Sequence, residues 1–163
     1  MLDLVNYERK RVLLPVALAC IVSVVGCNKG PTMVQVQGKV AYKDGSALRG
    51  GVRVVRFEPS KDSTAEVRRL ASGEIEKDGS FKLFTRRPGD GVFPGKYNVT
   101  FTVWKGSHEP TSFILDKYTT SATTPYHVTI DRDQDDLKFE LEPTPAAVGH
   151  QPATTESPGN GTQ

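Results

Sequence analysis

The sequence has little excess charge of either sign, few cysteines and only one long apolar run. Its 163 residues include 21 Lys and Arg against 19 Asp and Glu, a formal net charge of +2 at pH 7. Nucleic acids and anionic membrane surfaces attract strongly basic domains, whereas this chain has no basic run longer than two after residue 11. The charge balance therefore predicts no nucleic-acid partner, and it gives no reason to expect charge-driven binding to an anionic membrane.

The long apolar run covers residues 12–25 and follows the basic residues 9–11. A charged start, an apolar stretch and a small residue before the cleavage point are typical of an export signal. The run ends in Val-Val-Gly-Cys at residues 24–27. A cysteine directly after a small residue resembles the lipobox of bacterial lipoproteins. The resemblance implies that Cys27 receives a diacylglyceryl group and becomes the first residue of the mature protein.

Other interpretations of this leader stay open. The apolar run is shorter than the roughly 20 residues of a spanning helix, but an uncleaved signal anchor that borrows flanking residues is an alternative. An ordinary secretory signal that is cut elsewhere is another. Cys20 follows Ala19 and is a second candidate lipobox cysteine, although cleavage there would leave an apolar new N-terminus. We therefore predict a lipoprotein signal peptide over residues 1–26 and a lipid-anchored tether over 27–32.

The two cysteines also limit what the exported part can contain. If Cys20 leaves with the signal and Cys27 carries lipid, no thiol remains for a disulfide, a metal site or a nucleophile. The domain must then be held together by its core alone. Asn28 stands where some bacteria use an aspartate to retain lipoproteins at the inner membrane. We therefore expect a cell-envelope protein, with the outer membrane favoured.

Residues 33–142 alternate between apolar and polar side chains, with glycine-rich turns between the alternating segments. This pattern predicts strands over residues 34–42, 52–57, 71–77, 81–85, 97–103, 126–130 and 137–141. The second has a break in alternation between Val54 and Val55, which indicates a bulge or burial on both faces. The third has few apolar residues and is expected at an edge, and residues 105–124 are expected to form a long loop.

Seven short strands without a convincing helix predict an all-β fold, namely a seven-stranded antiparallel β-sandwich over residues 33–142. Residues 143–163 contain four prolines together with Thr, Ser, Gly and Gln, and Val148 is their one large apolar side chain. Such a composition cannot bury enough apolar surface to order a chain, so we expect a disordered tail.

Several motifs connect these strands to a known family. They read V-x-G-x-V-x-Y-x-D-G at residues 36–45, D-G-S-F at 78–81, D-G-x-x-P-G-K-Y-x-V at 90–99 and K-Y-x-x-x-x-T-T-P-x-x-V-x-I at 117–130. Together with the lipobox, they resemble small bacterial surface lipoproteins with one transthyretin-like, or carboxypeptidase-regulatory-like, domain. The resemblance implies the fold and the anchoring, and says almost nothing about function.

One acidic turn has the spacing of a calcium loop. Asp131, Asp133 and Asp135 stand at positions 1, 3 and 5, and Glu142 falls at position 12. However, position 6 is Asp136, where such loops need glycine, and residues 137–141 alternate like a strand. A solvated hairpin turn is therefore favoured over a Ca²⁺ site.

Candidate catalytic groups are few. The histidines are His108, His127 and His150, and no nucleophile or orienting third group stands beside them in the pattern. His127 is expected to point outward from its strand. Some transthyretin-like relatives hydrolyse a purine breakdown product and end in Tyr-Arg-Gly-Ser, whereas this chain ends in Asn-Gly-Thr-Gln. We therefore expect no enzyme activity and no cofactor.

Trp104 and Tyr118 flank the predicted long loop. Exposed aromatic side chains beside a sandwich can form a platform for a sugar or a peptide. Trp104 can equally cover one end of the core. The sequence as a whole favours a lipid-anchored, non-enzymatic module for protein interaction or adhesion, with envelope proteins or polysaccharide as partners. The alternative is a lipoprotein that binds a small ligand, either carbohydrate or Ca²⁺.

Overall fold

The computed structural model describes residues 32–63 and 65–149. The chain divides into two units, Met1–Gly30 and Pro31–Gln163, and every described element belongs to the second. These elements are β1 (Val36–Tyr42), β2 (Val52–Pro59), β3 (Ala71–Glu74), β4 (Ser80–Lys82), β5 (Gly95–Gly106), β6 (Glu109–Ser112), η2 (Asp116–Tyr118), β7 (His127–Ile130), β8 (Gln134–Leu141) and α1 (Pro145–Val148). The fold is all-β, as predicted.

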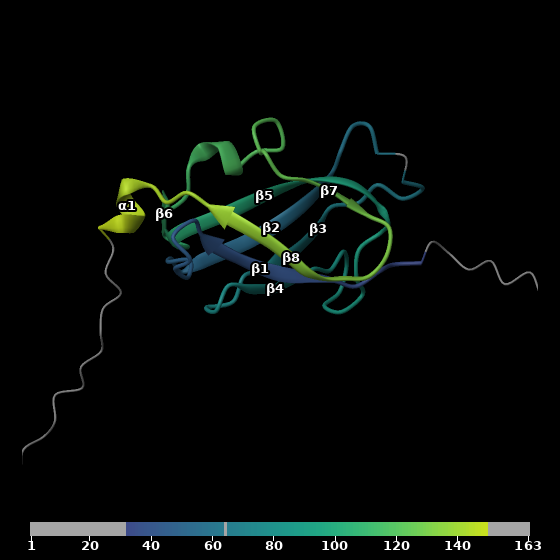
Figure 1. The fold of residues 1–163 in the computed structure, drawn as a ribbon, viewed down its shortest axis with the longest axis horizontal. Helices are drawn as coiled ribbons and strands as arrows, with labels where there is room; N and C mark the ends of the chain where they lie inside the picture. Colours follow the sequence, from purple (N-terminus) through teal and green to yellow (C-terminus); the bar gives the residue numbers. More distant parts are fainter. Residues whose placement is uncertain (1–31, 64, 150–163) are drawn as a thin grey trace, which may run out of the picture. The chain divides into compact units, whose positions relative to one another are not determined.

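The larger sheet has the strand order β3-β2-β5-β6, and β7 also pairs with β5 (Figure 1). β2 and β5 pair without interruption from Val52 opposite Trp104 to Pro59 opposite Tyr97. The expected bulge at Val54 is therefore absent, and the strand is not buried on both faces. Val55 and Phe57 point into the core, while Val54 and its alternate neighbours lie half-buried on the other face.

The smaller sheet has the order β4-β1-β8. β1 pairs antiparallel with β4 but parallel with β8, so the predicted wholly antiparallel arrangement is wrong. The cause is the connection before β8: the chain leaves β7 in the larger sheet and crosses to the smaller one, where β8 runs alongside β1 (Figure 1). The register shifts between Val36 and Gly38. A Cβ atom on Gly38 would lie 2.2 Å from the Leu137 carbonyl oxygen, so only glycine fits there.

Two isolated bridges connect the sheets at one side. Ser72 on β3 pairs with Phe84, and Ile75 pairs with Phe81 on β4. β3 is the last strand of the larger sheet, as expected from its few apolar residues, and these bridges cover part of its outer edge. Edge strands with unpaired backbone groups promote aggregation, so this contact protects an otherwise open edge.

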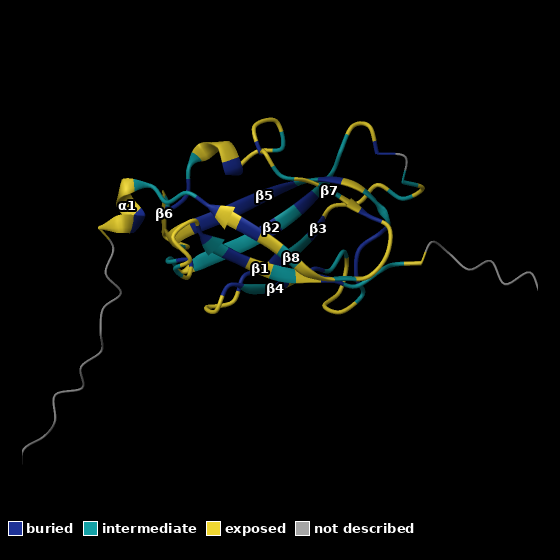
Figure 2. Ribbon diagram, in the orientation of Figure 1, coloured by how far each residue is buried: buried dark blue, intermediate teal, exposed yellow. Residues whose placement is uncertain are grey.

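The buried faces of the two sheets share one hydrophobic core (Figure 2). Phe139 of β8 contacts Phe57 of β2 and Phe101 of β5, with ring centroids 6.2 and 5.4 Å apart. Tyr97 lies at the start of β5, and its buried hydroxyl donates a hydrogen bond of 2.6 Å to the Phe93 carbonyl. Tyr97 is 1% exposed and thus belongs to the core at this point.

The structure contains eight strands in its described part rather than the predicted seven. The additional strand, β6, pairs with the end of β5 within the predicted long loop. Its residues are mostly exposed, so it has no apolar alternation from which it could be predicted.

The domain also continues beyond the predicted boundary at Glu142, since Pro143 pairs with Ile114 and Ala147 is 1% exposed. Arg49 donates to the Ala147 carbonyl at 2.9 Å and holds the single turn α1 in place.

Candidate functional site

The predicted aromatic platform does not form. Trp104 is 37% exposed on β5, whereas Tyr118 in η2 is 2% exposed. The Tyr118 ring stacks on Tyr126 at 5.9 Å, and the Lys117 ammonium lies 5.0 Å from its centroid. These neighbours cover Tyr118, so it belongs to the core.

Trp104 belongs instead to a face of the larger sheet that points away from the core. We call the side chains of Val52, Val54, Arg56, Thr102 and Trp104 the Trp104 face, because these alternate positions of β2 and β5 lie opposite the core-facing ones. Arg56 donates to the Thr102 hydroxyl at 2.8 Å, which holds its guanidinium against the sheet. The face thus combines an exposed indole, two half-buried valines and an oriented cation.

The acidic turn does not assemble as a metal site. In the described residues, no group of three or more His, Cys, Asp or Glu side chains is placed to hold a metal ion. The Asp133 carboxylate accepts the Gln35 backbone N–H at 2.7 Å, and Asp131 lies 4.0 Å from the Arg132 guanidinium. Asp135 already belongs to β8, which carries it into the strand.

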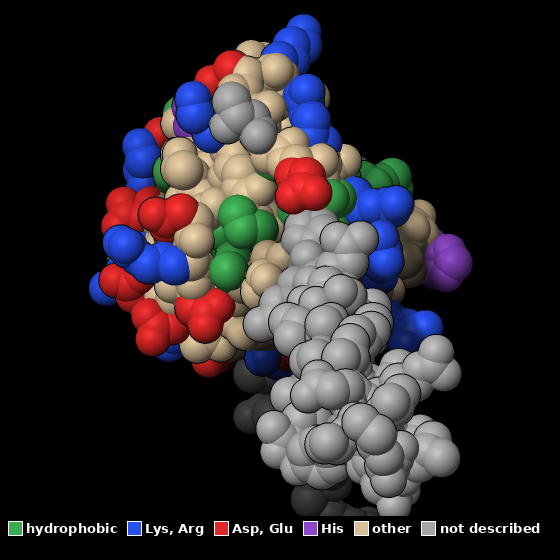
Figure 3. Space-filling model, turned by 90° about the vertical axis from the view of Figure 1, so that its right-hand side faces the viewer, with side chains coloured by type: hydrophobic (Ala, Val, Ile, Leu, Met, Phe, Trp, Pro, Cys, Tyr) green, Lys and Arg blue, Asp and Glu red, His purple; other side chains and the backbone are tan. Residues whose placement is uncertain are grey.

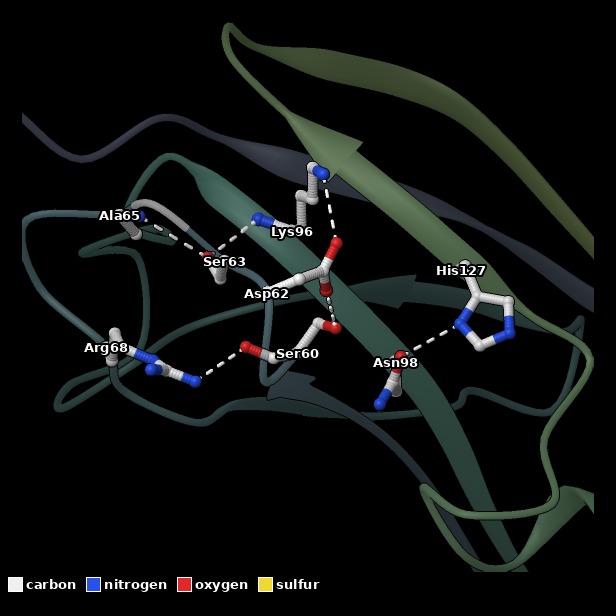
Figure 4. Close-up of polar contacts among 8 residues, drawn as sticks. All are labelled: Ser60, Asp62, Ser63, Ala65, Arg68, Lys96, Asn98 and His127. Atoms are coloured by element: carbon white, nitrogen blue, oxygen red, sulfur yellow. Dashed lines mark hydrogen bonds and ion pairs between the residues drawn. The ribbon is translucent and has the colours of Figure 1, made fainter.

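A polar cluster lies at the start of β5, shown in Figure 4. The Asp62 carboxylate accepts a short hydrogen bond from the Ser60 hydroxyl and an ion-pair contact of 3.0 Å from Lys96. These two partners hold the pKa of Asp62 at about 2, so it is a poor general base at neutral pH. The Ser63 hydroxyl accepts the Lys96 backbone N–H at 3.1 Å. The cluster ties the loop after β2 to β5.

Beside this cluster, His127 is exposed on β7, as predicted, and its Nδ1 lies 2.8 Å from the Asn98 side-chain oxygen. No described residue provides a nucleophile within hydrogen-bonding distance of this histidine. His108 is exposed in the turn between β5 and β6. The two histidines therefore lie on separate elements and do not converge.

A second ion-paired carboxylate, that of Glu142, lies beside the turn that follows β1. Glu142 contacts both Lys43 and Lys117, the latter at 3.0 Å. The hydrogen bond from Lys43, followed by that from Lys117, lowers the pKa of Glu142 to about 2. This arrangement links the turn after β1, the segment of η2 and the end of β8. The sequence pattern indicates only a possible calcium ligand at Glu142. Its structural role depends on contacts with residues that are distant in sequence.

Sequence reasoning also missed a contact at the free edge of β8. The Tyr126 hydroxyl donates to the Glu140 carbonyl and accepts the Glu140 N–H at 3.2 Å. One side chain therefore satisfies both backbone groups of Glu140, which point away from β1. No local pattern marks such a contact, because the two residues lie in different elements.

Grooves on the described surface are lined by loops in some places and by strands in others. One groove of about 540 Å³ is lined by residues before and within β5, by the loop after β2 and by the end of β7. Phe93 and Ile130 form its apolar floor, and Lys96 and Asp131 lie at its rim. Its charged lining residues are Glu66, Lys96 and Asp131.

Cys27 and the apolar run before it lie outside the described residues, so the predicted lipidation site has no structural description. Within the described residues, no helix has the length and apolar character required to span a bilayer. Comparisons with protein-family models, with curated proteins and with solved structures gave no match to this chain. The transthyretin-like resemblance therefore stays a prediction.

Proposed function

We propose that this protein is a lipid-anchored, non-enzymatic module of the cell envelope that binds other envelope macromolecules. The observation that carries the proposal is the leader: a basic start, an apolar run over residues 12–25 and a small residue directly before Cys27. A domain that begins a few residues after Cys27 is placed close to the membrane surface and faces its neighbours there. We infer, on the same basis, a transthyretin-like β-sandwich.

A binding role is supported by how the polar side chains are used. Asp62, Asp90 and Glu142 all have lowered pKa values because they accept hydrogen bonds that hold loops together. Carboxylates in this state stabilise the scaffold and are poorly suited to proton transfer at neutral pH. A scaffold with fixed loops and sheet faces is well suited to recognition.

The Trp104 face is the recognition surface that we infer. Trp and Arg are enriched at protein interfaces and among the central residues that carry most of the binding energy. Here Trp104 lies opposite Val52, and Arg56 is held in position by Thr102. Cross-linking in cells from a photoreactive amino acid at position 104, with position 138 on the other sheet as control, tests this surface. Products specific to position 104 support it, and a carbohydrate adduct would indicate a polysaccharide partner.

The anchor is tested by growing cells with a clickable palmitate analogue. The wild type should be labelled and should fractionate with membranes. Cys27→Ser should lose the label, whereas Cys20→Ser, which changes the other cysteine, should keep it. Absence of label on the wild type, or its loss in Cys20→Ser instead, would overturn the proposal that Cys27 is the lipidated residue.

A further inference from the structure

The turn between β4 and β5 presents two arginines on a rigid support. Asp90 accepts backbone N–H groups from Thr85 at 2.8 Å, Arg86 at 2.9 Å and Arg87 at 3.0 Å. The Thr85 hydroxyl donates to the Gly91 carbonyl at 2.8 Å and closes the turn. These N–H groups lower the pKa of Asp90, so its carboxylate stays ionised and engaged with the backbone. Both arginines are exposed.

The arginine side chains themselves have no such engagement. Neither the Arg86 nor the Arg87 guanidinium forms an ion pair with the described residues. The turn therefore offers two exposed cations on a hydrogen-bonded backbone to a partner outside the chain. Guanidinium groups bind carboxylates and phosphates through two parallel hydrogen bonds, and phosphate is the group of this kind that every phospholipid presents at a membrane surface.

The turn lies at the end where the described chain begins. Val34 and Val92 exchange two backbone hydrogen bonds, of 2.9 and 2.8 Å. The Gln35 side chain donates a hydrogen bond to the Gly89 carbonyl at 3.1 Å. The Gln35 backbone N–H donates to the carboxylate of Asp133 in the neighbouring turn. Figure 3 looks onto this end, where cationic side chains, acidic side chains and a hydrophobic area are all exposed. Residues 85–91, which we call the arginine turn, are thus hydrogen-bonded to the residues that lead into β1.

The distance to the anchor follows from chain length, and this step rests on the proposed lipidation of Cys27. From Cys27 to Thr32, the first described residue, a fully extended chain spans at most about 17 Å. The end that contains Val34 and the arginine turn must therefore stay close to the bilayer surface. Lys96 lines one groove together with Thr32, so it lies at this same end. About 27 Å of strand separates Lys96 from Trp104 near the other end of β5. Trp104 accordingly lies at the other end of the domain.

We propose that residues 85–91 are the membrane-facing surface of the domain and that Arg86 and Arg87 bind the phosphate groups of anionic lipid head groups. The nearly balanced charge of the chain gives it little attraction to a membrane from solution. An anchor changes this, because a tether raises the effective concentration of the head groups around the turn. The anchor holds the domain at the membrane, and the two arginines fix its orientation.

The experiment uses residues 27–163, which contain the whole second unit after Gly30. The Cys27 thiol is coupled to a maleimide lipid in vesicles of phosphatidylcholine, with or without phosphatidylglycerol. Because this coupling replaces biological lipidation, failure here is distinguishable from failure of the palmitate label in cells. Trypsin cleavage between Arg86 and Arg87, relative to cleavage after the exposed Lys105, reports access to the turn of the wild-type chain. With anionic vesicles the relative rate should fall severalfold, up to roughly thirtyfold if both arginines are held.

A second measurement reports proximity directly. Pro88→Trp in a Trp104→Phe background carries one indole in the turn, and a nitroxide on the lipid head group should quench it. Wild-type Trp104 should be quenched far less. Adding Arg86→Gln with Arg87→Gln should remove most of the quenching on anionic vesicles. Salt at 1 M should do the same, because it shortens the Debye screening length to about 3 Å.

The matched control is Lys39→Gln with Lys138→Gln, two exposed cations that lie side by side on β1 and β8. This variant makes the same change in net charge and should leave the quenching unchanged. The proposal is overturned if both vesicle types give the same cleavage ratio, or if the control lowers quenching as much as the arginine substitutions do.

Discussion

Phe139 is the side chain whose replacement tests most directly how the two sheets are held together. It is 4% exposed on β8 and contacts four other rings. Phe57, Phe81, Phe101 and Tyr126 surround it at centroid distances of 6.2, 6.1, 5.4 and 5.1 Å. Three of the four contacts are tilted strongly enough to bring a ring edge toward a ring face, the favourable geometry for aromatic pairs.

The substitution Phe139→Leu keeps an apolar side chain at this position but removes all four ring contacts. Each aromatic pair contributes about 0.5–1.5 kcal/mol beyond the burial of its area. Because the four pairs share one ring, we take the lower end of this range, which gives a loss of about 2 kcal/mol. The smaller side chain adds a loss of about 1 kcal/mol from reduced packing. The free energy of unfolding should therefore fall by about 3 kcal/mol in total.

The control is Phe93→Leu. Phe93 is also 4% exposed, but its ring has no aromatic partner among the described residues. Its replacement should cost only the packing term, about 1 kcal/mol. Urea unfolding of residues 27–163, with Cys27→Ser in every variant, measures both losses, and the m-value should stay constant. Equal losses for the two variants would refute the argument that ring contacts between the sheets supply the extra stability.

Three further predictions follow from single contacts. Tyr126→Phe removes the only described partner of the Glu140 backbone at the β8 edge, so light scattering should show self-association that rises with protein concentration. Glu142 has a pKa of about 2 when folded, below its ordinary 4.5, so its contribution to stability is present above pH 4.5 and is lost as pH falls toward 2. Glu142→Gln should therefore flatten the acid branch of a melting-temperature profile over this window. Gly91→Ala should destabilise the fold by more than Gly89→Ala, because both have a positive φ but only the former Cβ would meet a backbone oxygen, at 2.4 Å; equal melting temperatures would contradict this.

The strands and turns were predictable where the signal is local. Asp44 and Asp78 each begin an Asp-Gly turn, and each carboxylate accepts both the backbone N–H and the hydroxyl of the serine two residues later. Such turns need only a few neighbouring residues, so the sequence contains all the information. Period-two alternation located the buried strands for the same reason.

What could not be predicted depends on contacts between distant segments. The parallel pairing of β1 with β8 follows from a crossing between sheets, which alternation along either strand does not reveal. β6 is mostly exposed and contains Pro110, so it has no apolar pattern and includes a residue that is rare in strands. Tyr118 is predicted near the surface because it flanks the predicted long loop, but stacking on Tyr126 buries it. The platform hypothesis required Trp104 and Tyr118 together, and only one of them is exposed.

The position of β1 also bears on the proposed anchoring. If Cys27 is lipidated, a mechanical force between the membrane and a bound partner acts on the domain at the start of β1. This strand lies in the centre of its sheet, with β4 on one side and β8 on the other. An edge strand would be held by one ladder of hydrogen bonds, whereas β1 is held by two, and the Val34–Val92 bridge adds a third attachment before the strand begins. Removing β1 therefore requires both ladders to break together, so the first strand after the tether is an internal strand that is paired on both sides.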